Sequence, residues 1–172
     1  KVFGGLSFYQ RKEVKDLLAY LRLVINPKDN EAFKRIINYP KRGIGDSTVD
    51  KIIQLADELN ISSFEALEHF QTTGKAGQSL HNFYHMLLET KRLSEKTNAY
   101  EAAVHLFKVS GLSAELKQDL SQEGISRFEN VMSVLDGIKE FIEEDEIQEN
   151  ELTDRSLGSY IQSIALITEL DE

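Results

Sequence analysis

Cations, glycines and residues that favour a helix start occur together in one stretch, residues 36–48, which reads Ile-Ile-Asn-Tyr-Pro-Lys-Arg-Gly-Ile-Gly-Asp-Ser-Thr. Two cations, Lys41 and Arg42, precede the run Gly43-Ile44-Gly45, and Asp46 then opens a set of residue types that favour the start of a helix. A helix that starts after such a turn has unpaired N–H groups and the positive end of its dipole at its first residues. That combination favours phosphate and other anions. The stretch therefore predicts an anion-binding turn.

A Gly-apolar-Gly turn between two helices is typical of the helix-hairpin-helix, a module that contacts the DNA backbone. The alternative is a tight corner between two helices, in which the glycines serve only the turn and the cations beside them are solvated. The charge distribution favours the first interpretation. Five cations and two acids lie between Lys34 and Lys51, a local charge of +3, whereas the whole chain carries -9 and the remainder therefore -12.

Other candidate binding or catalytic motifs in the sequence are weak. His81 and His85 are four residues apart and could share a helix face, but no third ligand is near them in the sequence, so we expect no metal site. Gly74-Lys75-Ala76 lacks the spacing and the hydroxyl of a phosphate-binding P-loop. The chain has no cysteine, which excludes disulfides and thiolate metal sites and fits a reducing compartment. We predict no catalytic residue and no catalysis by this chain alone.

Helical periodicity predicts the elements that position the turn. Apolar residues recur at three- and four-residue spacing through most of the 172 residues, and no strand pattern follows the opening segment, a short extended piece within residues 1–8. The predicted fold class is therefore all-α, a multi-helix domain, with no apolar run of membrane length. We expect a polar loop at residues 72–77 and an acidic loop at about 143–154. The expected helices span residues 11–25, 30–38, 46–59, 64–70, 78–95, 99–110, 112–122, 125–144 and 156–167.

Two segments carry a resemblance to a known family. Residues 4–22, Gly-Gly-Leu-Ser-Phe-Tyr-Gln-Arg-Lys-Glu-Val-Lys-Asp-Leu-Leu-Ala-Tyr-Leu-Arg, resemble a segment of the UvrD/Rep/PcrA-type superfamily 1 DNA helicases. There a Gly-Gly precedes Phe-x-x-Arg-x-Glu-(Ile/Val)-Lys-Asp and then Tyr-Leu-Arg. Asn26-Pro27, Arg35-Ile36-Ile37-Asn38, Pro40 and Arg42-Gly43-Ile44-Gly45 follow in that family's order. Residues 163–171 also resemble the end of the same helical insertion.

The resemblance implies that this chain is a module of a larger machine. In these helicases two RecA-like motor domains bind and hydrolyse ATP, and a helical insertion called 2B sits in the second of them. Residues 1–10 would then be a stub of the second motor domain, and residues 11–172 the 2B-type domain. The parent would be a 3′-to-5′ DNA helicase that uses ATP and Mg²⁺. The fragment itself would need no cofactor and would neither hydrolyse ATP nor unwind DNA.

The resemblance also implies roles for particular residues. The glycine turn would contact duplex DNA at a fork, without sequence specificity, because phosphate contacts do not read bases. A second cluster would form an interdomain hinge, although a direct DNA contact from Arg11 is an alternative. The DNA-contacting residues would be Lys41, Arg42, Gly43, Ile44, Gly45, Ser47 and Thr48, and the hinge residues Arg11, Glu13, Lys15 and Asp16.

Two further functions remain open on sequence grounds. The domain could be a protein-interaction or autoinhibitory module of the helicase, receiving a regulatory partner on its outer helices. It could also be the helical domain of a related helicase-nuclease of the AddA/RecB type. In each case the expected partners are DNA, the motor domains of the same chain and regulatory proteins, without a membrane. The expected location is the bacterial cytoplasm, in association with the nucleoid.

Overall fold

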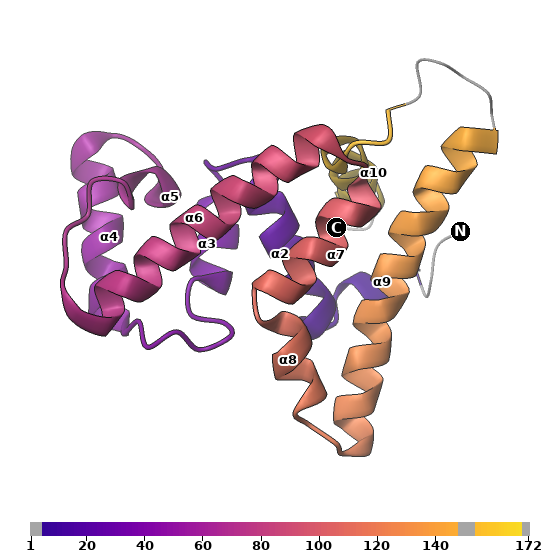
Figure 1. Cartoon of the computed structure of the whole chain (residues 1–172), viewed down its shortest axis with the longest axis horizontal. Helices are drawn as coiled ribbons and strands as arrows, with labels where there is room; N and C mark the ends of the chain where they lie inside the picture. The colour runs from indigo at the N-terminus through magenta and orange to yellow at the C-terminus, as the bar shows by residue number, and fades with distance from the viewer. Residues whose placement is uncertain (1–4, 148–153, 170–172) are drawn as a thin grey trace.

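Every regular element of the described protein is a helix. The computed structural model describes residues 5–147 and 154–169, and within them no strand is present (Figure 1). The all-α prediction is therefore confirmed. The helices are α1 (Gly5–Tyr9), α2 (Lys12–Ile25), α3 (Asn30–Ile36), α4 (Asp46–Leu59), α5 (Ser63–Ala66), α6 (Gly74–Lys96), α7 (Ala99–Val109), α8 (Leu112–Lys117), α9 (Gln122–Ile147) and α10 (Leu157–Glu169).

Helix α2 is the centre of the core. It packs against α1, α3, α6, α7, α9 and α10. The apolar stripe of its sequence predicts one buried face, yet 10 of its 14 residues are buried. A helix surrounded in this way is buried on nearly all sides. Its buried set includes two acids, Glu13 and Asp16, both of which have partners on neighbouring helices.

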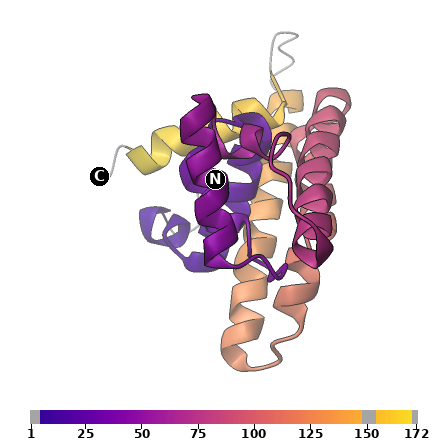
Figure 2. The same ribbon diagram turned by 90° about the vertical axis from the view of Figure 1, so that its left-hand side faces the viewer.

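The remaining helices extend from this centre in two directions. Helices α4 and α5 lie at one end of the molecule, α9 lies at the other, and the long α6 runs diagonally between them (Figure 1). Helices α8 and α9 pack against each other as a hairpin whose connection projects from the body (Figure 2). Both α4 and α6 begin at the same end of the molecule (Figure 1). None of the described helices is long and apolar enough to cross a membrane.

Several helix boundaries differ from the sequence-based prediction. Helices α3, α5 and α8 end at Ile36, Ala66 and Lys117, before the expected residues 38, 70 and 122. Helix α6 begins at Gly74, within the predicted polar loop. A Cβ at Gly77, inside this helix, would meet the carbonyl oxygen of Thr72 at 2.5 Å. That glycine lets the preceding loop fold back onto the helix. Helix α9 continues to Ile147, so the first part of the predicted acidic loop is helical, and residues 148–153 lie outside the described part. Helix α1 replaces part of the predicted extended opening, of which residues 1–4 are not described.

Candidate nucleic-acid interface

The glycine turn joins α3 to α4, as the sequence predicts. Helix α3 ends at Ile36, and the Tyr39–Pro40 peptide bond that follows is cis. Gly43 has a φ of +74°, a conformation that glycine adopts without steric cost. Gly45 is the N-cap of α4, with φ -77° and ψ 165°, and it has no side chain to cap the helix.

The turn is held from the inside by two residues. The side-chain oxygen of Asn38 accepts hydrogen bonds from the backbone N–H of Arg42 (2.8 Å) and of Ile44 (3.3 Å). The side chain of Ile44 is 2% exposed and belongs to the hydrophobic core. The sequence-based interpretation places the N–H of Ile44 against phosphate, but in the structure that N–H donates to Asn38. Ile44 therefore anchors the turn.

The two glycines on either side of Ile44 face open space. Both Gly43 and Gly45 are exposed, and a Cβ placed on either of them would meet no atom within 4 Å. The N–H groups of Gly45, Asp46 and Ser47 donate no hydrogen bond to any group in the described residues. The carbonyl oxygen of Gly45, by contrast, accepts from the N–H groups of Thr48 and Val49 in the first turn of α4. The turn thus presents free donors outward.

The side chain of Arg42 points into the domain. Its Nη1 donates to the carbonyl oxygens of Ile36 (2.8 Å), Ile37 (3.3 Å) and Pro40 (3.3 Å). Its Nη2 donates to the hydroxyl of Tyr20 and to the carbonyl oxygen of Ser110 (3.2 Å). The sequence-based interpretation places Arg42, like Lys41, among the DNA-contacting residues, with a solvated cation as the alternative. Neither interpretation includes a guanidinium that donates to carbonyl groups of α3, the turn and the end of α7.

Tyr20 is the buried partner of this guanidinium. Its side chain is fully buried, and its hydroxyl accepts from Arg42 while donating to the carbonyl oxygen of Tyr39 at 2.5 Å. Burial raises the pKa of Tyr20 to about 12, with the Arg42 charge acting in the opposite direction. The guanidinium also lies over the ring of Phe83, 4.9 Å from its centroid. These contacts fix the turn against α2 and α6.

The other predicted DNA-contacting side chains lie at the surface. Lys41 and Ser47 are exposed, and Thr48 is half-buried. Lys41 makes no ion pair with any described residue. Among the side chains proposed for phosphate, Lys41 and Ser47 are therefore free to contact a ligand beside the open donors. Asp46, in the first turn of α4, is also exposed and places one negative charge there.

The predicted hinge residues divide into two pairs. Asp16 is 3% exposed and accepts from Arg35 Nε (2.7 Å) and Lys12 Nζ (2.9 Å). Glu13 is 9% exposed and accepts from the side-chain amide of Asn130 at 2.8 Å. These two acids tie α2 to α3 and α9 within this domain.

The cations of the predicted hinge behave differently. Arg11 and Lys15 are exposed and make no ion pair within the part of the chain that the structure describes. The structure therefore does not bring the four predicted hinge residues into one network. A hinge contact of Arg11 or Lys15 with another domain stays a prediction.

The histidine pair lies on the exposed side of α6. The ring centroids of His81 and His85 are 4.3 Å apart, and both side chains are exposed. They line an open hollow of about 1000 Å³ between α6 and the segment after α5, together with Phe70 and Tyr84. Among the described residues, no group of three or more His, Cys, Asp or Glu side chains could hold a metal ion.

The sequence of this chain matches a known protein family over its whole length. A family model described as the UvrD-like helicase C-terminal domain matches residues 1–172. The chain belongs to this family. The resemblance that the opening and closing segments carry is therefore confirmed, and this is a UvrD-like helicase domain.

Relatives of this UvrD-like domain are similar over its whole length. The ATP-dependent DNA helicase PcrA of Staphylococcus aureus is 34% identical over 172 residues, which cover 98% of this chain. The PcrA helicase of Bacillus subtilis is 34% identical over 174 residues, 99% of this chain. That of Staphylococcus epidermidis is 36% identical over 172 residues, again 98%. The chain spans 23% of the length of each of these relatives.

Hydrophobic periodicity does not identify three residues that hold the turn or its guanidinium. Asn38 holds two N–H groups of the turn, and Tyr20 and Ser110 hold the guanidinium. Asparagine often accepts from a backbone N–H a few residues on, so Asn38 before the turn could have been singled out. The partners on α2 and α7 are 22 and 68 residues from Arg42, and only the fold brings them together.

Proposed function

We propose that this chain is a domain of an ATP-dependent 3′-to-5′ DNA helicase that contacts duplex DNA through the glycine turn. The observation that carries the proposal is the set of open N–H donors at Gly45, Asp46 and Ser47. These donors lie at the positive end of the α4 dipole, where phosphate is favoured. The bare Gly45 position leaves room for a DNA backbone to approach closely.

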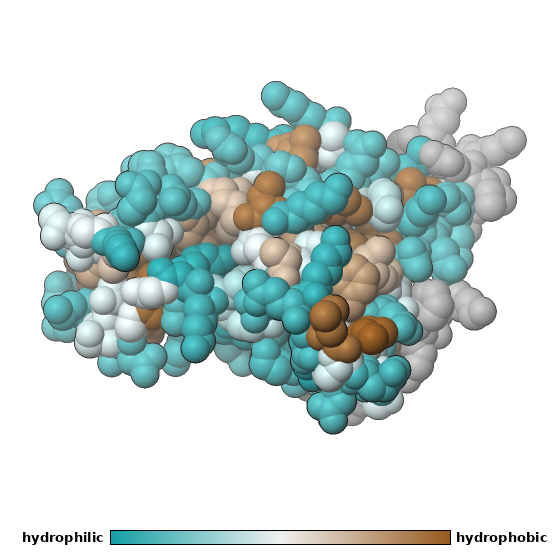
Figure 3. All heavy atoms as spheres, turned by 60° about the horizontal axis from the view of Figure 1, so that its bottom comes forward, coloured by the Kyte–Doolittle hydropathy of each residue, from teal (hydrophilic) through white to brown (hydrophobic). Residues whose placement is uncertain are grey.

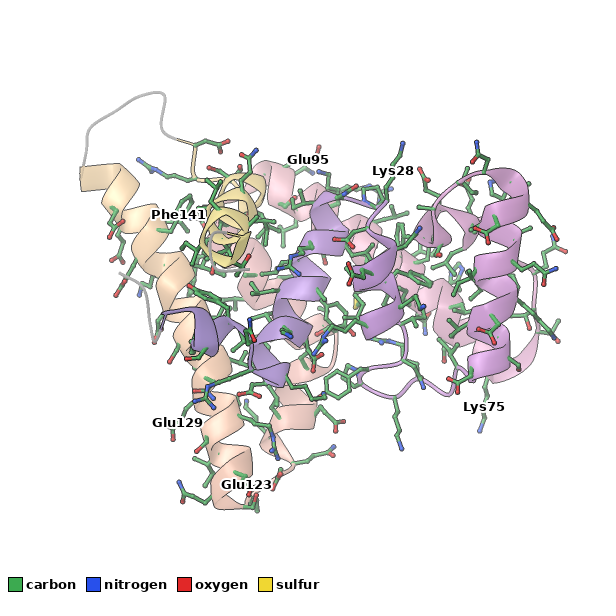
Figure 4. All side chains as sticks on the ribbon, turned by 180° about the vertical axis from the view of Figure 1, so that it is seen from behind. Lys28, Lys75, Glu95, Glu123, Glu129 and Phe141 are labelled. Carbon is green, nitrogen blue, oxygen red and sulfur yellow. The ribbon has the colours of Figure 1, made fainter. Side chains whose placement is uncertain are left out.

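The charges around the turn support the same assignment. Lys41 is exposed in the turn that leads to the open donors, and Lys75, at the start of α6, lies at the end of the molecule where α4 begins (Figure 4). The chain as a whole carries a charge of -9. A net negative domain disfavours broad, non-specific coating of DNA and leaves a local contact. A few phosphate contacts position the domain on the duplex without reading its sequence.

Fluorescence anisotropy tests this proposal with a labelled duplex that bears a 3′ single-stranded tail. The affinity of this chain would be measured at several salt concentrations for the unaltered protein, Lys41→Ala and Gly45→Asp. We expect Lys41→Ala to reduce the salt slope by about one unit, as the loss of one phosphate contact does. A carboxylate about 5 Å from a phosphate costs roughly 3 kcal/mol at an effective dielectric constant of about 20, so Gly45→Asp should weaken binding at least about tenfold.

Lys28→Ala is the matched control for the lysine variant. Lys28 is exposed like Lys41 but lies on the opposite side of the domain from Lys75 (Figure 4). Its loss lowers the net charge by the same amount without altering the turn, so its salt slope should equal that of the unaltered protein. Equal effects of Lys28→Ala and Lys41→Ala, with no effect of Gly45→Asp, would refute a DNA contact at the turn.

The proposal also covers ATP hydrolysis by the longer helicase of which this chain would be one domain. The similar helicases from Staphylococcus and Bacillus are named as ATP-dependent DNA helicases. We propose that ATP and Mg²⁺ are bound by other domains of the same polypeptide, because no G-x-x-x-x-G-K-[ST] segment occurs in this sequence. DNA and those motor domains would then be the partners of this chain. The names of the relatives favour a helicase over a helicase-nuclease, which would carry a nuclease motif elsewhere in its chain.

A second candidate function is protein binding at the tip of the α8–α9 hairpin. Figure 3 shows a mostly hydrophilic face on which hydrophobic residues gather over this hairpin. Leu120 is 82% exposed and Ile125 is 42% exposed. Apolar side chains exposed in this way favour an interaction surface. Binding of a helicase regulator that is lost in Leu120→Ser and unchanged in Lys41→Ala would support this function.

A further inference from the structure

The guanidinium of Arg42 is surrounded by hydrogen-bond acceptors of its own domain, unlike that of an exposed arginine that binds phosphate. Its Nη1 and Nη2 groups donate to four carbonyl oxygens and one hydroxyl, drawn from α2, α3, the turn and the end of α7. Only its Nε–H has no hydrogen-bond acceptor among the described residues. Bidentate recognition of phosphate needs two parallel N–H groups of one guanidinium. The geometry of Arg42 leaves one.

The acceptors of Arg42 explain what the side chain does. The carbonyl oxygens of Ile36 and Ile37 are at the C-terminal end of α3, where helix carbonyls lack partners within the helix and where a cation is favoured. Arg42 satisfies both of them and also the carbonyl oxygen of Pro40. It therefore holds the acceptors of the turn inward, while the donors of the next helix stay outward. A turn with its carbonyl groups facing out would repel phosphate.

Two further contacts seat the turn on the rest of the domain. The hydroxyl of Tyr20 links Arg42 to the carbonyl oxygen of Tyr39. On the other side, Arg42 donates to the carbonyl oxygen of Ser110, and a Cβ placed on Gly111 would meet the ring of Pro40 at 3.5 Å. The orientation of the turn is thus set by α2 and by the α7–α8 corner, neither of which carries the glycine motif.

We propose that Arg42 is a positioning residue, which orients the glycine turn for phosphate through Tyr20 and Ser110 and makes no phosphate contact itself. The inference rests on the proposed function. It predicts that lysine cannot replace Arg42, since an ammonium is a single point of charge and cannot reach acceptors on both sides of a planar fork. It also predicts that Tyr20 affects DNA binding although its side chain is 0% exposed.

The experiment is the anisotropy titration with the tailed duplex, carried out on Arg42→Lys, Tyr20→Phe and the double variant at several salt concentrations. Arg42→Lys keeps the charge, and Tyr20→Phe removes only a buried hydroxyl. We expect each single variant to weaken binding by about two- to a hundredfold, the range of coupling within one hydrogen-bond network. The double variant should be no weaker than the worse single variant. The salt slope should stay unchanged in all three, unlike the loss of about one unit in Lys41→Ala.

Each result separates this inference from the proposed function. If Gly45→Asp abolishes binding while Arg42→Lys and Tyr20→Phe bind like the unaltered protein, the turn contacts DNA but Arg42 is not its positioning residue. Arg42→Ala is added because, unlike Arg42→Lys, it removes the charge. If it lowers the salt slope as Lys41→Ala does, Arg42 contacts phosphate directly and the inference is wrong. Thermal unfolding establishes that each variant is folded, and Tyr20→Phe provides the decisive comparison if an Arg42 variant does not fold.

Discussion

The two glycines of the turn should respond to substitution with opposite signs in stability. Gly43 has a φ of +74°, so an L-residue there pays the left-handed backbone penalty of roughly 1–2 kcal/mol. Gly45 has a φ of -77° and open space where a Cβ would lie. Aspartate at that N-cap gains a few tenths of a kcal/mol over glycine, and its charge at the helix start gains about 0.3–1 kcal/mol more.

We therefore expect Gly43→Ala to lower the free energy of unfolding by about 1–2 kcal/mol. Gly45→Asp should raise it by about 0.5–1 kcal/mol, less whatever repulsion Asp46 adds. Urea unfolding followed by far-UV circular dichroism measures both, and unchanged m-values would show that only stability has changed. Gly45→Ser is the neutral control, because it supplies an N-cap oxygen without a charge.

The reasoning would be refuted if Gly45→Asp and Gly45→Ser were as destabilised as Gly43→Ala. In that case the fold itself would require glycine at position 45, and its bare surface would say nothing about an external ligand. A stabilised Gly45→Asp that has lost its affinity for DNA would separate the two roles. The glycine would then serve binding at some cost to the helix start.

Three further changes test the packing of the turn and the capping of α5. Ile44→Ala should lower the free energy of unfolding by about 2–5 kcal/mol in urea, because it removes a core side chain that is 2% exposed. Ser62→Ala should lower the free energy of unfolding by about 1 kcal/mol, because Ser62 caps α5 in a reciprocal capping box with Glu65. The control Ser62→Thr keeps the hydroxyl and should retain most of this stability. The N–H of Ser62 lowers the pKa of Glu65 from its usual 4.5, so Glu65 contributes stability above that pH that is lost as the pH falls through its folded pKa. Carboxyl NMR should give a midpoint below 4.5, and Glu65→Gln should flatten the acid limb of the stability profile.

Periodicity predicted the helices that carry regular apolar stripes. The expected ranges of α2 and α4 end at Ile25 and Leu59, where the structure also ends them. Those two helices have an apolar stripe and a clear stop, at Asn26-Pro27 for α2 and at the left-handed residue Asn60 for α4. Local sequence was sufficient there because the signal and its cause both lie within a few residues.

The boundaries that could not be predicted depend on tertiary contacts. Glycine usually interrupts a helix, yet Gly77 lies inside α6 because its missing Cβ admits the carbonyl oxygen of Thr72. Gly124 does the same in α9, where a Cβ would meet the carbonyl oxygen of Asp119 at 2.3 Å. A glycine kept for close packing and a glycine kept for a turn look identical in a sequence. Only the fold distinguishes them.

The candidate site was predictable in its position but not in the direction of its side chains. The motif gave the place of the turn and its open helix start. The sequence treated Lys41 and Arg42 alike, and the structure directs one outward and the other into five acceptors. In a helix or strand the spacing of residues predicts which way each side chain points, but an irregular turn has no such regular spacing. The acceptors that decide the direction of Arg42 come from segments far along the chain.

An NMR titration of the ¹⁵N-labelled domain with the tailed duplex at low salt would show directly whether the glycine turn contacts DNA. If the turn contacts the DNA backbone, the amide signals of Gly43, Gly45, Asp46 and Ser47 should shift first and furthest. Their shifts should be absent when Gly45→Asp is titrated. Shifts that instead centre on the α8–α9 hairpin or on the hollow beside His81, and that leave the turn unchanged, would contradict the account.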